Sequence, residues 1–175
     1  MRTKLLFLSL ITASICFAQS RREIILSEGW QFSRDKAQWE NVIVPHDWAI
    51  SGPFDKKWDI QTVAIVQNGE KTATEKTGRS GALPWIGEGY YKLTFQIPEG
   101  YKHAELIFDG AMAEPTVSIN GKKAGYWAYG YNAFRIDATP YLTSGNNQLE
   151  VSLNNLEESS RWYPGAGLIR PVKLI

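Results

Sequence analysis

The residue types best suited to ligand recognition lie in two loop-like stretches of this sequence. One is residues 159–167, SSRWYPGAG, which contains Arg161, Trp162 and Tyr163. A loop that only turns the chain needs Gly, Pro, Asn or Asp. A guanidinium beside two aromatic rings can instead donate hydrogen bonds to hydroxyl groups and lie against a planar or ring-shaped ligand. We therefore interpret these three residues as candidate substrate-binding groups.

The second stretch is residues 77–89, TGRSGALPWIGEG, which places Arg79, Trp85 and Glu88 among four glycines. Glycine lets a backbone approach a ligand closely, although it also permits tight turns without any ligand. Functional side chains concentrate on loops, and this loop combines a guanidinium, an indole and a carboxylate. These three are the remaining candidate substrate-binding residues.

A third cluster has a structural interpretation that we favour over a functional one. His46, Asp47 and Trp48 follow Pro45 in the stretch VPHDWAISGPFD, and a sugar- or metal-facing His-Asp pair is one interpretation of them. A lone pair lacks the further ligands of a typical metal site. We therefore favour an Asx-type turn, in which Asp47 caps backbone N–H groups and Trp48 fills the rim of the core.

Residues 125–134, GYWAYGYNAF, form an aromatic run. Aromatic side chains dominate sheet interiors, so we predict that most of these rings pack across the core rather than against a ligand. The five rings belong to Tyr126, Trp127, Tyr129, Tyr131 and Phe134.

Hydrolysis of a glycosidic bond needs two carboxyl groups flanking one sugar ring. The close pairs in the sequence are Asp55 with Asp59 and Glu157 with Glu158, and both lie among polar residues that leave them solvated. Nucleophile motifs such as G-x-S-x-G and metal-ligand spacings are absent. We therefore predict no catalytic residue, no metal site and no cofactor in this chain.

The elements that position these residues are predicted to be β-strands, because hydrophobic residues alternate with polar ones over most of the chain. In residues 89–100, Tyr91, Leu93, Phe95 and Ile97 share a face. Similar patterns predict strands in residues 41–45, 60–72 (folding back at Asn68-Gly69), 104–110, 115–121 (with an Asn120-Gly121 hairpin turn), 147–155 and 168–175. Residues 137–142, DATPYL, suggest one helical turn. Many short strands separated by turn signals indicate an all-β sandwich or barrel.

The first 18 residues are predicted to be a signal peptide, because basic residues precede a short apolar stretch and Ala18 suits cleavage before Gln19. Cys16 suggests lipidation instead, but Ile15 is bulky for that motif, so we favour simple export to the periplasm or beyond. The chain of 175 residues has a formal net charge of +1 and this single cysteine. We expect no disulfide, no nucleic acid partner and no membrane segment after signal removal.

Seven stretches, taken in order, resemble the N-terminal sugar-binding domain of glycoside hydrolase family 2, particularly exported β-galactosidases of the Bacteroidetes type. They are GWQFSRD, VPHDWAISGPFD, TGRSGALPWIGEGYYKLTF, FDGAMAEPTVSINGKKAG, YGYNAFRIDATPYL, GNNQLEVSLNN and SRWYPGAGLIRPVKL. The resemblance implies a galactose-binding-like jelly-roll β-sandwich over residues 19–175. It also implies that the two candidate loops help to shape a sugar subsite.

In full-length members of this family, an immunoglobulin-like domain and a TIM barrel with both catalytic glutamates follow. The resemblance therefore implies that this chain is inactive alone, that those domains are its partners, and that the bound glycan is a terminal β-galactoside. Arg161 stands where another branch of the family has a metal- and sugar-contacting aspartate, so no metal role is carried over. A free-standing carbohydrate-binding module and a structural or adhesion sandwich are the alternatives.

Overall fold

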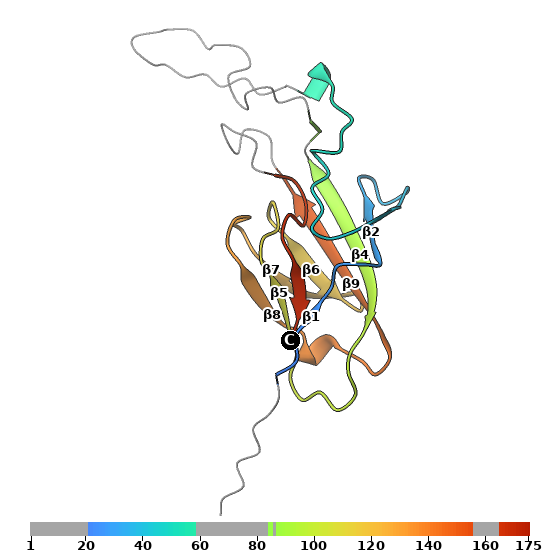
Figure 1. Cartoon of the computed structure of the whole chain (residues 1–175), viewed down its shortest axis with the longest axis vertical. Coiled ribbons are helices and arrows are strands. Elements are labelled where there is room, and N and C mark those ends of the chain that lie inside the picture. Colours follow the sequence, from blue (N-terminus) through green and yellow to red (C-terminus); the bar gives the residue numbers. More distant parts are fainter. Residues whose placement is uncertain (1–20, 59–83, 86, 156–164) are drawn as a thin grey trace, which may run out of the picture.

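The structure, a computed structural model, describes residues 21–58, 84–85, 87–155 and 165–175. Within these ranges the chain forms two antiparallel sheets packed face to face (Figure 1). The smaller sheet has four strands, in the order β1 (Ile24–Ile25), β10 (Val172–Leu174), β5 (Glu105–Phe108) and β8 (Phe134–Asp137).

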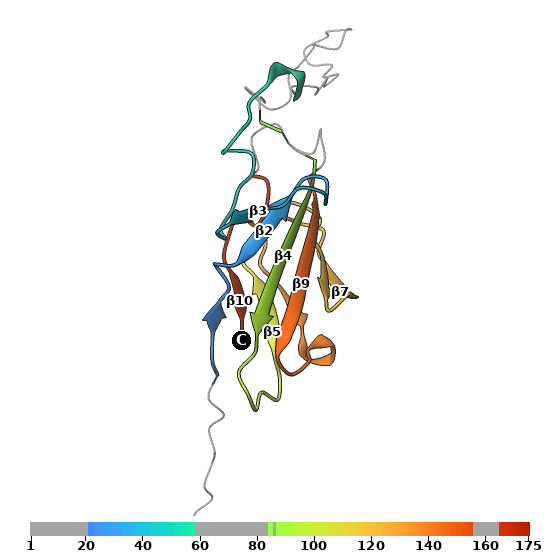
Figure 2. The same ribbon diagram turned by 90° about the vertical axis from the view of Figure 1, so that its right-hand side faces the viewer.

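The larger sheet has six strands in the described part of the chain. In spatial order they are β3 (Glu40–Val42), β2 (Trp30–Ser33), β4 (Glu88–Gln96), β9 (Asn146–Asn154), β6 (Thr116–Ile119) and β7 (Lys122–Tyr126). In Figure 2, β2, β4 and β9 lie side by side in front of β5 and β10, which belong to the smaller sheet. The arrangement is the all-β sandwich that the sequence predicts.

Helix is confined, over the described ranges, to two 3-10 turns, η1 (Lys56–Trp58) and η2 (Thr139–Tyr141). η2 confirms the helical turn predicted near residues 137–142. No helix in the described part is long and apolar enough to cross a membrane.

The centre of the larger sheet is the pairing of β4 with β9, in which nine consecutive residues of each strand are in register. Alternate side chains of both strands point into the sandwich, as the period-two pattern predicts. The buried side chains are Tyr91, Leu93 and Phe95 from β4 and Leu149, Val151 and Leu153 from β9. The predicted strands at residues 104–110 and 115–121 are confirmed as β5 and β6. Asn120 and Gly121 turn the chain into β7 with φ angles of 50° and 75°, as a tight hairpin turn requires.

Two strand predictions were wrong in extent. The closing strand covers only Val172–Leu174, because Pro171 has no N–H for a ladder and Gly167 is engaged in an isolated bridge with Met112. The strand predicted at residues 41–45 ends at Val42, since the Val44 N–H donates to the Ser27 carbonyl outside the ladder. The strand predicted at residues 60–72 lies outside the described residues.

The prediction that the aromatic run packs across the core was also wrong. Phe134 is buried and stacks on Phe108, but Tyr126, Trp127 and Tyr129 are 50%, 40% and 55% exposed. The reason is topological, because β7 is the last strand of its sheet and the residues after it cross to the other sheet around the outside of the sandwich. Trp127 covers Phe134 from that outer side, with the ring centroids 5.8 Å apart.

Candidate functional site

The described residues of both candidate stretches lie at one end of the sandwich, which we call the loop end. It consists of residues 45–58, which follow β3, residues 84, 85 and 87, which precede β4, and residues 155 and 165–168, which lie between β9 and β10. In Figure 1 these residues lie at the top, and the C-terminus lies at the opposite end.

Backbone hydrogen bonds tie the three segments of the loop end together. The Trp48 N–H donates to the Ala166 carbonyl (2.9 Å), which joins residues 45–58 to residues 165–168. Asn155 bridges the other two segments, because its backbone N–H donates to the Gly87 carbonyl (3.0 Å) and its side-chain amide donates to the Gly165 carbonyl (3.0 Å). One asparagine therefore links a residue of each candidate stretch, Gly87 and Gly165.

Asp47 confirms the structural interpretation of the His-Asp pair. Its Oδ1 atom accepts hydrogen bonds from the N–H groups of Ala49 and Ala166, both at 3.1 Å. The first bond makes an Asx turn, and the second fastens that turn to the segment before β10. No group of three or more His, Cys, Asp or Glu residues suited to a metal occurs in the part of the chain that the structure describes.

Trp85, one of the predicted site residues, lies half-buried at the rim of the loop end. It packs against the buried indole of Trp48 with 5.7 Å between the ring centroids, and Trp48 stacks in turn on Phe32 at 5.2 Å. The Arg34 guanidinium lies over Trp85 at 4.7 Å and donates to the Gly52 carbonyl. Core rings below and a cation above thus fix the position of this indole.

Glu88, another predicted site residue, lies elsewhere. It is exposed on the outer face of the larger sheet, where its carboxylate accepts a short hydrogen bond from the Tyr90 hydroxyl. That bond is the main cause that raises the pKa of Tyr90. The structure therefore gives Trp85 and Glu88 different surroundings. The other predicted site residues, Arg79, Arg161, Trp162 and Tyr163, lie outside the described residues.

Beneath the rim, His46 and Tyr91 form a polar contact that the sequence did not predict. The Tyr91 hydroxyl lies 2.7 Å from His46 Nδ1 and also receives the Leu168 backbone N–H. Burial lowers the pKa of His46 and raises the pKa of Tyr91 above its ordinary value. A neutral imidazole whose Nδ1 accepts a hydrogen bond from the Tyr91 hydroxyl satisfies both groups. The alternation in β4 indicated a buried Tyr91, but nothing in the sequence indicated its partner.

Two buried polar atoms at the loop end have no hydrogen-bond partner in the described structure. They are Nε1 of Trp48, a donor, and Oδ1 of Asn155, an acceptor. Each such atom costs about 1–3 kcal/mol when it is left unpaired. Both atoms belong to residues that hold the segments of the loop end together.

The described carboxyl groups with shifted pKa values do not resemble a catalytic acid. Hydrogen bonds lower the pKa of Asp35, Asp55 and Asp137. The largest contribution comes from the Gln38 backbone amide for Asp35 and from the Lys57 backbone amide for Asp55. For Asp137 it comes from the Thr139 hydroxyl. A general acid in glycoside hydrolysis needs the opposite shift.

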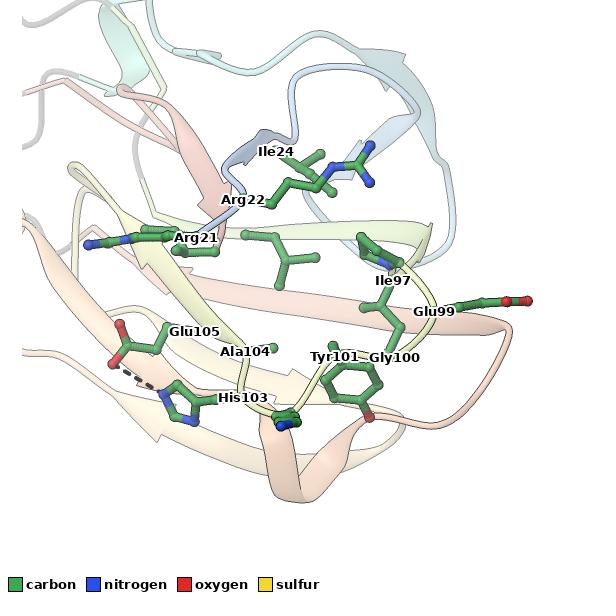
Figure 3. A pocket seen from close by; sticks show the side chains of 14 residues that line it. Arg21, Arg22, Ile24, Ile97, Glu99, Gly100, Tyr101, His103, Ala104 and Glu105 are labelled. Atoms are coloured by element: carbon green, nitrogen blue, oxygen red, sulfur yellow. Dashed lines mark ion pairs between the residues drawn. The ribbon is translucent and has the colours of Figure 1, made fainter. Parts of the chain in front are cut away.

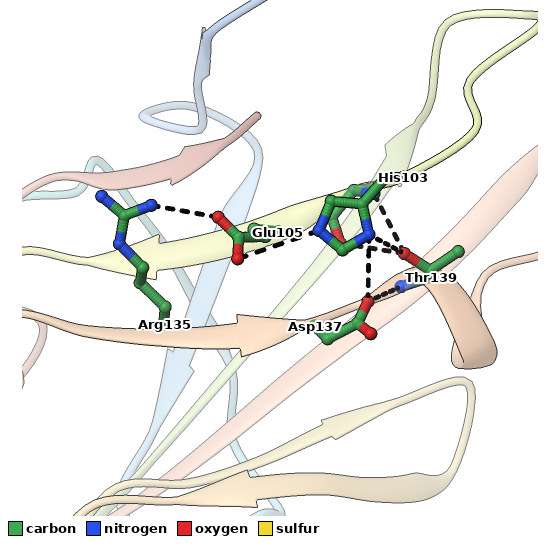
Figure 4. A network of polar contacts seen from close by, with 6 residues as sticks. His103, Glu105, Arg135, Asp137 and Thr139 are labelled. Atoms are coloured by element: carbon green, nitrogen blue, oxygen red, sulfur yellow. Dashed lines mark hydrogen bonds and ion pairs between the residues drawn. The ribbon is translucent and has the colours of Figure 1, made fainter. Parts of the chain in front are cut away.

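The other end of the sandwich has a cavity of about 750 Å³ between the start of β1 and the β4–β5 connection. Figure 3 shows Arg21 and Arg22 pointing to opposite sides of the backbone there, so their charges do not converge. Beside it, His103 lies 3.8 Å from both Glu105 and Asp137, and Arg135 pairs with Glu105 at 3.0 Å (Figure 4). These exposed contacts join β5 to β8 and contribute little to stability.

A family model described as "Glycosyl hydrolases family 2, sugar binding domain" matches residues 11–169. The chain belongs to glycosyl hydrolase family 2. It is 37% identical over 140 residues to β-galactosidase BoGH2A of Bacteroides ovatus, and 34% identical over 157 residues to a protein of Formosa agariphila named as a β-glucuronidase. These matches cover 78% and 86% of the chain.

Solved family 2 structures share the fold. A member from Bacteroides cellulosilyticus superposes with a TM-score of 0.70 at 26% identity, over 88% of this chain, and a β-glycosidase from Bacteroides vulgatus with 0.65 at 31%, over 89%. The chain spans 14% of the length of each of the two named relatives and 20% of each of these solved structures. It therefore corresponds to the sugar-binding domain of much longer glycosidases.

Proposed function

We propose that this chain is the non-catalytic, exported sugar-binding domain of a retaining family 2 β-glycosidase, and that its loop end forms one wall of the sugar subsite. The observation that carries the proposal is the bridge made by Asn155, which joins Gly87 to Gly165. Because of this bridge, the glycine two positions after Trp85 and the glycine four positions after Arg161 accept hydrogen bonds from the same asparagine.

The composition of the loop end supports a sugar as the ligand. Trp85 is a half-buried indole at the rim whose orientation is already fixed by Trp48 and Arg34, and a preorganised side chain loses little entropy on contact with a sugar.

The proposed substrate is a terminal β-galactoside. The relative from Bacteroides ovatus is named as a β-galactosidase, whereas the one from Formosa agariphila is named as a β-glucuronidase. The two substrates differ at C6, which is a hydroxymethyl group in a galactoside and a carboxylate in a glucuronide, and in the configuration at C4. An assay of the full-length protein with aryl β-galactoside and aryl β-glucuronide therefore separates them. Faster turnover of the glucuronide would overturn the galactoside assignment and leave the accessory role standing.

The accessory role is tested by replacing Arg161 with Ala in a protein that includes the catalytic barrel. If Arg161 donates hydrogen bonds to sugar hydroxyls, kcat/KM falls about tenfold or more, equivalent to about 1.4 kcal/mol of transition-state binding. If Arg161 contacts the sugar and has no structural role, the melting temperature of the variant should stay nearly constant. Arg135→Ala is the matched control, because Arg135 is exposed on β8 and pairs only with Glu105 among its described neighbours.

Unchanged kinetics of the Arg161 variant, or a loss of activity that follows its loss of stability, would indicate that residues 159–167 have a structural role. An equal loss of kcat/KM in the Arg135 variant would show that the effect is not specific to the loop end.

A further inference from the structure

The outer face of the larger sheet has a cleft of about 250 Å³ that is separate from the loop end. Its floor comes from β4, β9 and β6, and one wall comes from the turn between β2 and β3. The side chains that matter here are Lys36 and Trp39 on the wall, and Tyr90, Ser152, Thr116, Glu150 and Ser118 on the floor. Figure 2 shows β4 and β9 side by side, with the β2–β3 turn beside them.

The floor consists of two rows of side chains that run across the strands. In the first row, Tyr90 is in register with Ser152, Ser152 with Thr116, and Thr116 with Tyr126. Two hydroxyls are thus flanked by two aromatic rings. Adjacent strands are about 4.8 Å apart, so the two tyrosines stand roughly 14 Å apart, a span that suits a short oligosaccharide.

The second row lies one pleat further along the same strands. Lys92 is in register with Glu150, Glu150 with Ser118, and Ser118 with Lys123. This row adds a carboxylate acceptor and a third aliphatic hydroxyl to the floor, with an ammonium donor on either side. Charges of both signs therefore border the cleft, which favours a neutral, hydroxyl-rich ligand over an ion.

The side chains of Thr116, Ser118, Glu150 and Ser152 make no hydrogen bond or ion pair to any group in the described part of the chain. Their donors and acceptors are available to a ligand, and regular strands fix their spacing. Groups held on strands keep a more constant geometry than groups on loops.

The wall of the cleft is also held in place. Ser33 Oγ accepts from the Lys36 N–H (2.8 Å), and Asp35 Oδ1 accepts from the N–H groups of Ala37 and Gln38. These caps close the β2–β3 turn. Lys36 then lies over the Tyr90 ring at 4.2 Å.

Trp39 completes this wall. Its indole N–H donates to the Lys36 carbonyl at 3.0 Å, and the Lys92 ammonium lies 3.9 Å from the centre of its ring. On the floor, the Glu88 carboxylate accepts a hydrogen bond from the Tyr90 hydroxyl and so restrains the position of the Tyr90 ring. The aromatic residues beside the cleft are therefore positioned before any ligand arrives.

We propose that this cleft is a second carbohydrate-binding site, which takes a neutral oligosaccharide of two or three sugar units along the row from Tyr90 to Tyr126. A protein partner fits the cleft less well, because the cores of protein interfaces are depleted in Lys, Glu and Ser. The site would hold the domain on a polysaccharide while the loop end stays free.

The test is a titration of the isotopically labelled chain with three neutral trisaccharides, cellotriose, β-1,4-mannotriose and β-1,4-galactotriose, followed by amide NMR shifts. At least one should give saturable shifts at the amides of Thr116, Ser118, Glu150 and Ser152 below about 10 mM. Glu150→Gln and Ser152→Val should each weaken that binding at least about tenfold. Tyr126→Ala, at an exposed position, provides a third variant should either of these fail to fold.

Thr94→Val and Gln148→Ala are matched controls, because these residues pair with each other on the same outer face, one row beyond Lys92 and Glu150. They should leave the affinity unchanged. The proposal is overturned by the absence of saturable shifts with all three sugars, by shifts confined to Trp85 and residues 165–168, or by equal affinity in the cleft and control variants. Self-association that moves the same amides without sugar would assign the face to protein contact instead.

Discussion

At the scale of single residues, Gly167 shows how closely the loop end is packed. Its φ of +127° is rare for residues with side chains, and an added Cβ would overlap the Tyr91 hydroxyl and the His46 carbonyl. Backbone strain and overpacking together should make Gly167→Ala less stable by about 3 kcal/mol. Urea denaturation measures this change.

Gly145→Ala is the control for the Gly167 experiment. Gly145 also has a positive φ, of +89°, but no atom lies within 4 Å of its hypothetical Cβ. In this variant only backbone strain should act, and the free energy of unfolding should fall by about 1 kcal/mol. Equal losses of stability in the two variants would mean that Tyr91 and His46 do not prevent a methyl group at position 167.

His46 gives the domain a dependence on pH. Because burial lowers its pKa in the folded state, the unfolded chain binds more protons once the pH falls below about 6.5. The free energy of unfolding should therefore be constant above neutral pH and should decrease from about pH 7 to pH 5. His46→Gln should flatten this decrease, as measured by urea denaturation across that range.

A slope that persists in His46→Gln would contradict this prediction, because it would show that another titratable group, and not the buried imidazole, causes the pH dependence.

At the scale of elements, Asn147 holds the start of β9 to its surroundings. Its buried side chain accepts from the Thr143 N–H and the Asn120 amide, and donates to the carbonyls of Thr143 and Gly145. Asn147→Ala leaves these partners unpaired and should cost about 3 kcal/mol. Thermal unfolding measures the loss. Asn146→Ala, at the exposed neighbouring position, should cost less than about 0.5 kcal/mol.

The elements that the sequence predicted well are those in which a strand has one buried and one exposed face. The alternation in β4, β6 and β9 reported directly which side chains enter the core. The aromatic run did not follow this pattern, because Tyr126 ends the edge strand β7, and Trp127 and Tyr129 lie in the exposed connection that follows it. Residue type alone does not indicate that position in the sheet.

Candidate site residues were harder to predict than strands. Glu88 and Trp85 are three positions apart in sequence, but the entry into β4 lies between them, so one side chain faces the outer surface and the other faces Trp48. The contact of His46 with Tyr91 joins residues 45 positions apart. Such pairs depend on which strands become neighbours, and the local pattern does not contain that information.

At the scale of the whole molecule, the sandwich should fold and bind without catalysing hydrolysis. We expect the chain from Gln19 onward to give a β-dominated far-UV circular dichroism spectrum with little helix. Assayed alone, it should hydrolyse aryl β-galactosides no faster than buffer, since neither proton donation nor covalent capture is available without two suitably placed carboxyl groups. Turnover that copurifies with the chain and scales with its concentration would contradict this.

The last strand of the larger sheet, β7, has a consequence for the behaviour of the domain at high concentration. An edge strand offers unpaired N–H and C=O groups that can recruit a strand from another molecule. β7 begins with two exposed lysines, Lys122 and Lys123, and its pairing with β6 is irregular between Val117 and Ser118. A second β7 approaching this edge would bring four ammonium groups together on a locally irregular ladder. We therefore expect this edge to repel a second copy of itself, which disfavours edge-to-edge association through β7.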